Sequence, residues 1–147
     1  MSEENVEVVR AAIEALARSR PEEMAEGVER TWDPAGDFHP PQKFLESRPC
    51  HGREEISRYY ANWREIWDQL EYKIRELVPV GDDRVLAHTT VSGEGRASGA
   101  RLEGDLYLCY WLRHRRVFRE EQHVTLAGAL RGFGLEGESL ETVGLEG

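Results

Sequence analysis

Residues 53–80 read REEISRYYANWREIWDQLEYKIRELVPV and contain the change from helical to extended patterning that decides the fold. In the first half, apolar and aromatic residues recur at spacings of four, three and four, which places them on one helical face: Ile56, Tyr60, Trp63 and Trp67. The second half, residues 70–80, has the pattern of a strand and ends at the turn-forming residues 81–83. We therefore predict a helix over 53–67 that is followed directly by a strand.

Three further strand patterns follow toward the C-terminus, at residues 85–91, 102–112 and 117–124. A Gly- and Ser-rich stretch at 92–99 and a short basic turn at 113–116 separate them. Thr125 is placed to cap a last short helix through Leu130, which Gly132 and Gly134 end.

Helical patterns precede the quoted segment on its N-terminal side. Ser2 is a suitable N-cap for a helix with an apolar stripe, and Pro21 starts a second, weaker helix. Residues 32–36 have the composition of a turn, and residues 37–41, DFHPP, predict a brief or edge strand that the prolines stop. Residues 42–51 are expected to form a loop.

Helices followed by a run of neighbouring antiparallel strands indicate the α+β class. We predict a strongly curved antiparallel sheet with the N-terminal helices packed into its inner face and an internal pocket at its open end. This single domain is expected to span residues 1–135. Residues 136–147 are rich in Gly and Glu and predict an acidic, disordered tail.

The chain has 147 residues, with 28 acidic and 19 basic side chains and a net charge of −9. This balance excludes a general nucleic-acid binder, which needs a basic face. Because the N-terminus is acidic and no apolar run approaches about 18 residues, we expect a soluble cytoplasmic protein without a membrane partner. The preference for Arg over Lys favours a GC-rich bacterial genome. Residues 32–135 are nearly neutral, with 16 acidic and 15 basic side chains, which suits an uncharged or weakly polar ligand.

The two cysteines, Cys50 and Cys109, lie 59 residues apart and lack the spacing of a metal site. We expect free thiols, with Cys109 an inert packing residue. The sequence has no phosphate-binding loop and no nucleophile elbow, so we predict neither a metal nor a cofactor.

Four segments together resemble one family: SEENVEVVRAAIEAL, DFHPP, HGREEISRYYANW and HVTLAGALRGFGL. They resemble the SnoaL-like group of the nuclear transport factor 2-like superfamily, over residues 2–135. The resemblance implies a cone of three N-terminal helices and a bent antiparallel sheet around a deep apolar pocket. It also implies a homodimer through the outer face of the sheet.

The same resemblance speaks against a ketosteroid isomerase mechanism. It implies that His39 stands at the position of the isomerase base, and that Tyr60 matches a pocket tyrosine. The positions of the two isomerase oxyanion donors fall at Ala12 and near Leu108, which have no donor to offer. Two of three isomerase groups are therefore missing.

The candidate catalytic residues are His39, Asp37 and His123. His39 has an imidazole, a side-chain type suited to general acid or base catalysis, and Asp37, two residues earlier in an extended segment, lies on the same face and is placed to orient the ring. His123 pairs with Glu121 on one face of the last strand, opposite Glu120. The alternative for these residues is an exposed strand end, a solvated surface or a dimer interface.

The candidate substrate-binding residues are mainly aromatic: Trp32, Tyr59, Tyr60, Trp63, Tyr110 and Arg119. The alternative for most of them is packing of the helix against the sheet, although a buried Tyr hydroxyl needs a partner. The family pattern places Tyr110 inward and Trp111 outward.

Two functions follow from this pattern. The first is a protein that binds a small apolar or aromatic ligand and performs cofactor-independent proton transfer, isomerisation or cyclisation with His39. The second is a non-catalytic ligand-binding or accessory dimeric module. A cavity in which His39 meets Tyr60 or His123 favours the first.

Overall fold

The computed structural model describes residues 2–41 and 48–135, so the expectations for 42–47 and for the tail at 136–147 lie outside it. Its helices are α1 (Ser2–Arg18), η1 (Pro21–Glu23), α2 (Met24–Thr31), α3 (Gly52–Ile66) and α4 (Leu126–Gly132). Its strands are β1 (Trp32–His39), β2 (Cys50–His51), β3 (Trp67–Val80), β4 (Arg84–Gly95), β5 (Arg101–Arg113) and β6 (Arg116–His123). The predicted order of helices and strands is confirmed, except that the short strand β2 was not predicted.

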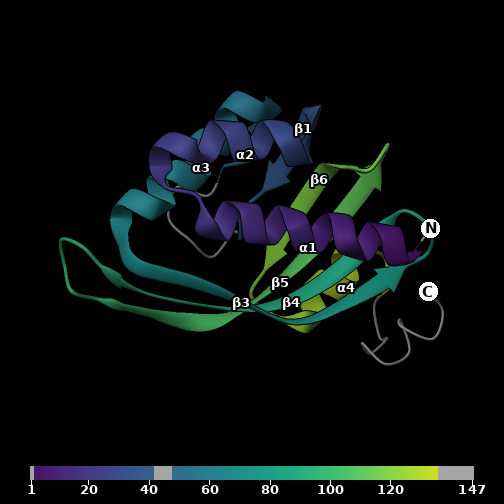
Figure 1. Cartoon of the computed structure of the whole chain (residues 1–147). Helices are drawn as coiled ribbons and strands as arrows, with labels where there is room; N and C mark the ends of the chain where they lie inside the picture. Colours follow the sequence, from purple (N-terminus) through teal and green to yellow (C-terminus); the bar gives the residue numbers. More distant parts are fainter. Residues whose placement is uncertain (1, 42–47, 136–147) are drawn as a thin grey trace.

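The six strands form one curved sheet in the order β2-β1-β6-β5-β4-β3. Neighbouring strands are antiparallel, as predicted, except that β1 runs parallel to β6. Figure 1 shows α1, α2 and α3 on one side of the sheet and α4 on the other. The α+β architecture predicted from the sequence is therefore present, with an inner face under three helices and an outer face that α4 partly covers.

Two apolar clusters hold these layers together. The inner apolar core joins α1, α2 and α3 to the sheet through side chains such as Val9, Ile56 and Val85. The outer apolar core packs Leu130 and Phe133, from α4 and the residue after it, against Leu86 and other sheet residues. Thr125 caps α4 as predicted, because its hydroxyl accepts a hydrogen bond of 3.0 Å from the Gly128 amide.

Residues 32–36, predicted as a turn, are part of β1, and this prediction is corrected. The pairing of β1 with β6 is interrupted between Trp32 and Asp37, so the intervening residues bulge from the ladder. The Asp33 carboxylate accepts a hydrogen bond of 2.8 Å from the Ala35 amide, which is the turn chemistry that the sequence showed. Gly36 lies against the Trp32 ring, where a Cβ would come within 2.5 Å of a ring carbon. The turn is thus a bulge inside a strand.

Within the described residues, no helix is long and apolar enough to span a membrane. Cys50 and Cys109 are free thiols, and burial raises the pKa of Cys109 well above its ordinary value. The residues before α3, predicted as loop, include the two-residue strand β2, which pairs with β1.

Candidate active site

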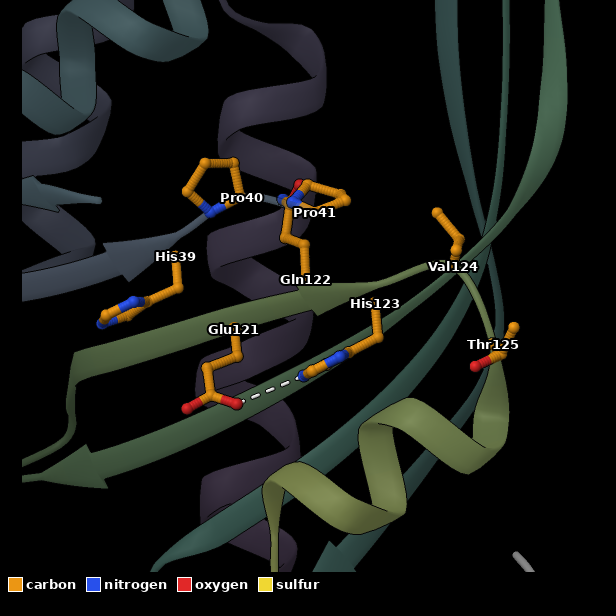
Figure 2. Close-up of a pocket in the computed structure, with 8 residues that line it drawn as sticks. All are labelled: His39, Pro40, Pro41, Glu121, Gln122, His123, Val124 and Thr125. Carbon is orange, nitrogen blue, oxygen red and sulfur yellow. Dashed lines mark hydrogen bonds and ion pairs between the residues drawn. The ribbon is translucent and has the colours of Figure 1, made fainter. Parts of the chain in front are cut away.

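β6 carries polar side chains on both faces, and its alternation sends them to opposite sides of the sheet. Glu120 and Gln122 are buried on the inner face, where Glu120 lies opposite Phe38 of β1. Arg119, Glu121 and His123 point to the outer face, and Figure 2 shows Glu121 and His123 pointing away from Gln122. β6 lies between β1 and β5 and is therefore an interior strand of the sheet.

The inner face holds a buried carboxyl group, Glu120, which is 1 % exposed. The Tyr60 hydroxyl on α3 donates to both carboxylate oxygens, at 3.0 and 3.1 Å. Gln122 Nε2 donates to Oε2 at 2.8 Å, and the Tyr110 hydroxyl on β5 also hydrogen-bonds to Glu120. Four side chains from three elements therefore form one buried polar group, which we call the inner cluster: Tyr60, Tyr110, Glu120 and Gln122.

Burial controls the protonation of the inner cluster. It raises the pKa of Glu120 to about 7, against the smaller opposing effect of the three hydrogen bonds from Gln122, Tyr60 and Tyr110. Burial also raises the pKa of Tyr60 and of Tyr110, so that both hydroxyls keep their protons. Glu120 is thus poised to hold or release a proton near neutral pH, between two neutral donors.

A small cavity lies beside the inner cluster. Its volume is about 20 Å³, enough for roughly one water molecule. Its lining is Ile13, Leu16, Ala17, Tyr60, Tyr72, Leu108, Tyr110 and Gln122. All three hydrogen-bond partners of Glu120 belong to this lining, whereas Glu120 itself does not, so the buried carboxyl group adjoins the cavity through these partners.

Of the predicted binding aromatics, Tyr60 and Tyr110 line the cavity, whereas Trp32, Tyr59 and Trp63 lie around it. Phe38 connects them: its ring centroid lies 4.7 Å from that of Tyr59, 5.3 Å from Tyr60 and 6.4 Å from Trp32. The indole Nε1 of Trp32 is buried, and no hydrogen-bond partner for it is present among the described residues. Tyr59, Trp63 and Trp32 pack in the apolar core of the inner face and do not line this cavity.

On the outer face, Asp37 gathers three cationic or ionisable side chains. His39 Nε2 and Arg119 Nη1 lie 2.9 and 2.8 Å from its Oδ2. His51 Nδ1 lies 2.7 Å from its Oδ1, an ion-pair contact whose angles fall outside hydrogen-bond geometry. The predicted orientation of His39 by Asp37 is present in this geometry.

Glu121 extends the outer arrangement toward α4. It accepts from Arg119 Nη2 at 2.7 Å and lies 3.2 Å from His123 Nε2 (Figure 2). These partners hold the pKa of Glu121 below its ordinary value, chiefly through the hydrogen bond from His123. We call the linked side chains the outer cluster: Asp37, His39, His51, Arg119, Glu121 and His123.

A cleft of about 400 Å³ opens beside the outer cluster. His39, which is 30 % exposed, and His123, which is 26 % exposed, both line it with Glu121 and Thr125. α4 packs closely here, because a Cβ at Gly132 would lie 2.7 Å from Glu121 Oε1. His39 and His123 therefore share one cleft, and Asp37 contacts His39 from outside its lining. No group of His, Cys, Asp and Glu in the described part of the chain is placed to hold a metal ion.

Residues 9–120 match a family of SnoaL-like domains. The chain belongs to the SnoaL-like domain family. No curated protein matches it.

Solved structures show the same fold at low sequence identity. Bal32a, from a soil-derived mobile gene cassette, has a TM-score of 0.74 at 19% identity, over 90% of this chain and 97% of that one. A Catenulispora acidiphila protein with a ketosteroid isomerase-like fold, in complex with trimethylamine, has a TM-score of 0.68 at 16% identity, over 92% and 95%. A putative SnoaL-like polyketide cyclase from Jannaschia has a TM-score of 0.68 at 15% identity, over 97% and 93%.

The SnoaL-like domain places His39 and Tyr60 on opposite faces of the sheet. The sequence favoured catalysis in a cavity where His39 meets Tyr60 or His123. His39 shares the outer cleft with His123, while its neighbour Phe38 points inward toward Tyr60. Tyr110 and Trp111 have the predicted inward and outward orientations, since Tyr110 packs in the inner apolar core and Trp111 packs against Phe133 on the outer face.

Sequence reasoning assigned no role to the most unusual group of the SnoaL-like domain, Glu120. The alternation of β6 was visible in the sequence and placed Glu120 with Gln122 on one face. Both faces carry polar or charged residues, however, so the alternation alone does not tell which face is buried. Phe38 supplied a usable signal. An apolar residue between Asp37 and His39 has to point inward, and Glu120, which pairs with Phe38 on β6, has to point to the same side.

Proposed function

We propose that this SnoaL-like domain binds a small, mainly apolar carbonyl compound inside the cone and moves a proton with Glu120. The observation that carries this proposal is a fully buried carboxyl group whose pKa is about 7 and whose three hydrogen-bond partners all line one cavity. A general acid or base works best when its pKa is near the working pH.

In the proposed reaction, the ionised Glu120 takes a proton from the carbon next to the substrate carbonyl. The electron pair of the broken C–H bond moves onto the carbonyl oxygen, which becomes an enolate. The hydroxyls of Tyr60 and Tyr110, which donate to Glu120 before the reaction, then turn and donate hydrogen bonds to the enolate oxygen while Glu120 holds the proton. In an isomerisation, protonated Glu120 then returns the proton to another carbon of the substrate. In an aldol cyclisation, the enolate instead attacks a second carbonyl, and the alkoxide that forms takes the proton from Glu120.

The relatives support a small organic ligand in this fold. The Catenulispora acidiphila structure holds trimethylamine, and the Jannaschia protein is described as a putative SnoaL-like polyketide cyclase. Both are statements about those proteins, and we extend to this chain only the class of ligand.

Hydrogen–deuterium exchange tests the proposal without a known substrate. Cyclic enones and β-diketones are incubated with the protein in D2O, and loss of the proton next to the carbonyl is followed by NMR. The intact chain should accelerate exchange of at least one compound, and Glu120→Gln should reduce that rate by about 100-fold or more. Glu121→Gln is the matched control and should keep the rate, so an equal loss in both variants contradicts the role of Glu120.

The outer cluster supplies a second candidate, in which His39 is the acid or base, Asp37 orients it and His123 faces it across the cleft. The contact of 2.9 Å between His39 and Asp37 and the cleft of about 400 Å³ favour it. In the same exchange assay, this candidate predicts that His39→Asn removes activity while Glu120→Gln retains it. Ligand binding without any exchange would instead support the non-catalytic module.

We further propose that the protein is a homodimer through the part of the outer sheet face that α4 leaves uncovered. His88 and Tyr107 stack there with ring centroids 4.5 Å apart, beside the charged Asp105. Light scattering should give twice the chain mass of 16.9 kDa. A monomer at micromolar concentration would reject this interface.

A further inference from the structure

A groove of about 560 Å³ follows the edge of the sheet between α1 and β3. Three of its lining residues, Ile13, Ala17 and Tyr72, also line the cavity beside Glu120. These three side chains therefore form the partition between the groove and the inner cluster. The groove has a volume typical of small-molecule sites, whereas the cavity behind the partition has room for roughly one water.

The floor and the rim of this groove differ in chemistry. On α1, Arg10, Glu14 and Arg18 are spaced by four residues and form one charged stripe, with Ile13 and Ala17 beside it. On β3, apolar and aromatic side chains on the inner face continue the floor: Leu70, Tyr72 and Ile74. The groove is thus an apolar channel with charged margins.

The charges along the groove are mainly positive. Its lining includes four cationic side chains and two anionic ones: Arg10, Arg18, Lys73, Arg75, Glu14 and Glu71. Arg75 Nε donates to Thr90 at 3.1 Å on the outer side of β3, so it acts on the groove through its field. Arg10 lies 3.6 Å from Glu7, an exposed pair of little energetic weight. An excess of cations here is unusual in a chain of net charge −9.

We propose that the groove between α1 and β3 is the entrance to the cone and the outer half of its ligand site, and that it selects flat apolar molecules with one anionic group. The inference rests on the proposed function, since the reacting end of the ligand reaches the inner cluster when the side chains of Ile13 and Tyr72 turn aside from the partition. The apolar body lies on Ile13, Leu70 and Tyr72. The anionic group lies at Arg10 and Arg18.

A pair of fluorescent probes tests this selection. Anilinonaphthalene sulfonate and the same ring system without the sulfonate, phenylnaphthylamine, are titrated into the full chain. The double variant Arg10→Glu and Arg18→Glu should weaken sulfonate binding by about ten-fold or more and change binding of the neutral probe by less than about two-fold. Arg58→Glu, the same change of charge on the exposed side of α3, should leave both affinities unchanged.

Three results overturn the proposal. They are equal weakening of both probes in the double variant, the same loss of sulfonate binding in Arg58→Glu, and failure of both probes to bind the intact chain at millimolar concentration. Glu120→Gln separates the two proposals, because it should keep the discrimination between probes while losing deuterium exchange. Probe discrimination without exchange in the intact chain rejects the proposed function and keeps the groove. Deuterium exchange without discrimination between the probes rejects the groove and keeps the proposed function.

Discussion

Two adjacent glutamates on β6 occupy opposite environments. Glu120 faces the inside of the cone, has hydroxyl and amide donors, and has its pKa raised to about 7 by burial. Glu121 faces the outer cleft, has Arg119 and His123 as partners, and has its pKa lowered. These two glutamates are adjacent on one strand, yet Glu120 can exchange a proton at neutral pH whereas Glu121 stays ionised.

The comparison teaches that burial and the charge of the partners, more than the number of hydrogen bonds, decide the protonation state. The neutral donors around Glu120 favour its ionised form but do not offset the loss of hydration. Around Glu121, a guanidinium and an imidazole supply hydrogen bonds and positive charge together, and the cleft leaves it partly hydrated. The inner cluster suits proton transfer, whereas the outer cluster suits charge pairing.

The largest expected effect is that of Glu120→Gln on stability. The pKa of Glu120 is about 7 in the folded chain and about 4.5 in the unfolded chain. Protonation therefore stabilises the fold fully below about pH 4.5, and this contribution is lost as the pH rises through about 7. Above that pH the buried charge costs about 3 kcal/mol, which the amide avoids.

Urea unfolding at pH 8 should accordingly show Glu120→Gln to be more stable than the intact chain by about 3 kcal/mol. The fall in stability between about pH 4.5 and 7 that Glu120 causes should disappear in the variant. A variant that is less stable at pH 8, or one that keeps the same fall, would contradict the assignment.

The second prediction removes one donor of the inner cluster. Tyr60→Phe takes away the hydroxyl that reaches both oxygens of Glu120, at 3.0 and 3.1 Å. Because that hydrogen bond favours the ionised form, the pKa of Glu120 should rise further, and stability at pH 8 should fall by about 1–2 kcal/mol. Titration of the labelled carboxyl carbon by NMR measures the pKa, with Tyr59→Phe as the matched control that should leave it unchanged.

The third prediction is the outer counterpart of the first. Since the pKa of Glu121 is lowered on folding, its ionised form stabilises the fold above its unfolded pKa, and this contribution is lost as the pH falls through the folded pKa. Glu121→Gln should therefore destabilise the chain at pH 8, by about 1 kcal/mol because the cleft hydrates the pair. Opposite signs for Glu120→Gln and Glu121→Gln in urea unfolding would support the comparison, and equal signs would break it.

The smallest expected effect is that of Asp37→Asn. The substitution weakens the contacts with His39, His51 and Arg119, while Arg119 keeps Glu121. We expect a loss of about 0.5 kcal/mol that shrinks in high salt, because these charges are partly exposed. Thermal unfolding at low and high salt measures it, and a loss that does not respond to salt would point to packing instead.

The sequence predicted local structure well because the information is local. The spacing of Ile56, Tyr60 and Trp63 defines a helix face without knowledge of any partner, and the strands after it follow from composition and turns. The pairing of β1 with β6 joins residues about 80 positions apart, and its parallel direction leaves no mark in either segment. β2 has only two residues and no pattern of its own.

The candidate site was only partly predictable for the same reason. His39, Asp37 and His123 were candidates because of chemistry and alternation. His39 and His123 line one cleft, and Asp37 contacts His39 at 2.9 Å. Which face of β6 points inward depends on pairing with Phe38, and the sequence contains this only indirectly. The raised pKa of Glu120 arises from how completely α1, α3 and the sheet exclude water from it, a property of packing that no residue pattern contains.

The polar alternation of β6 also bears on how the chain folds. A shift of the strand by one position would carry Arg119, Glu121 and His123 into the apolar interior and expose Glu120 and Gln122 to solvent. Burial of three ionisable side chains without their partners is far more costly than burial of one carboxyl group that has three donors. The mixed charges of β6 thereby disfavour a shift of one residue from the observed strand register.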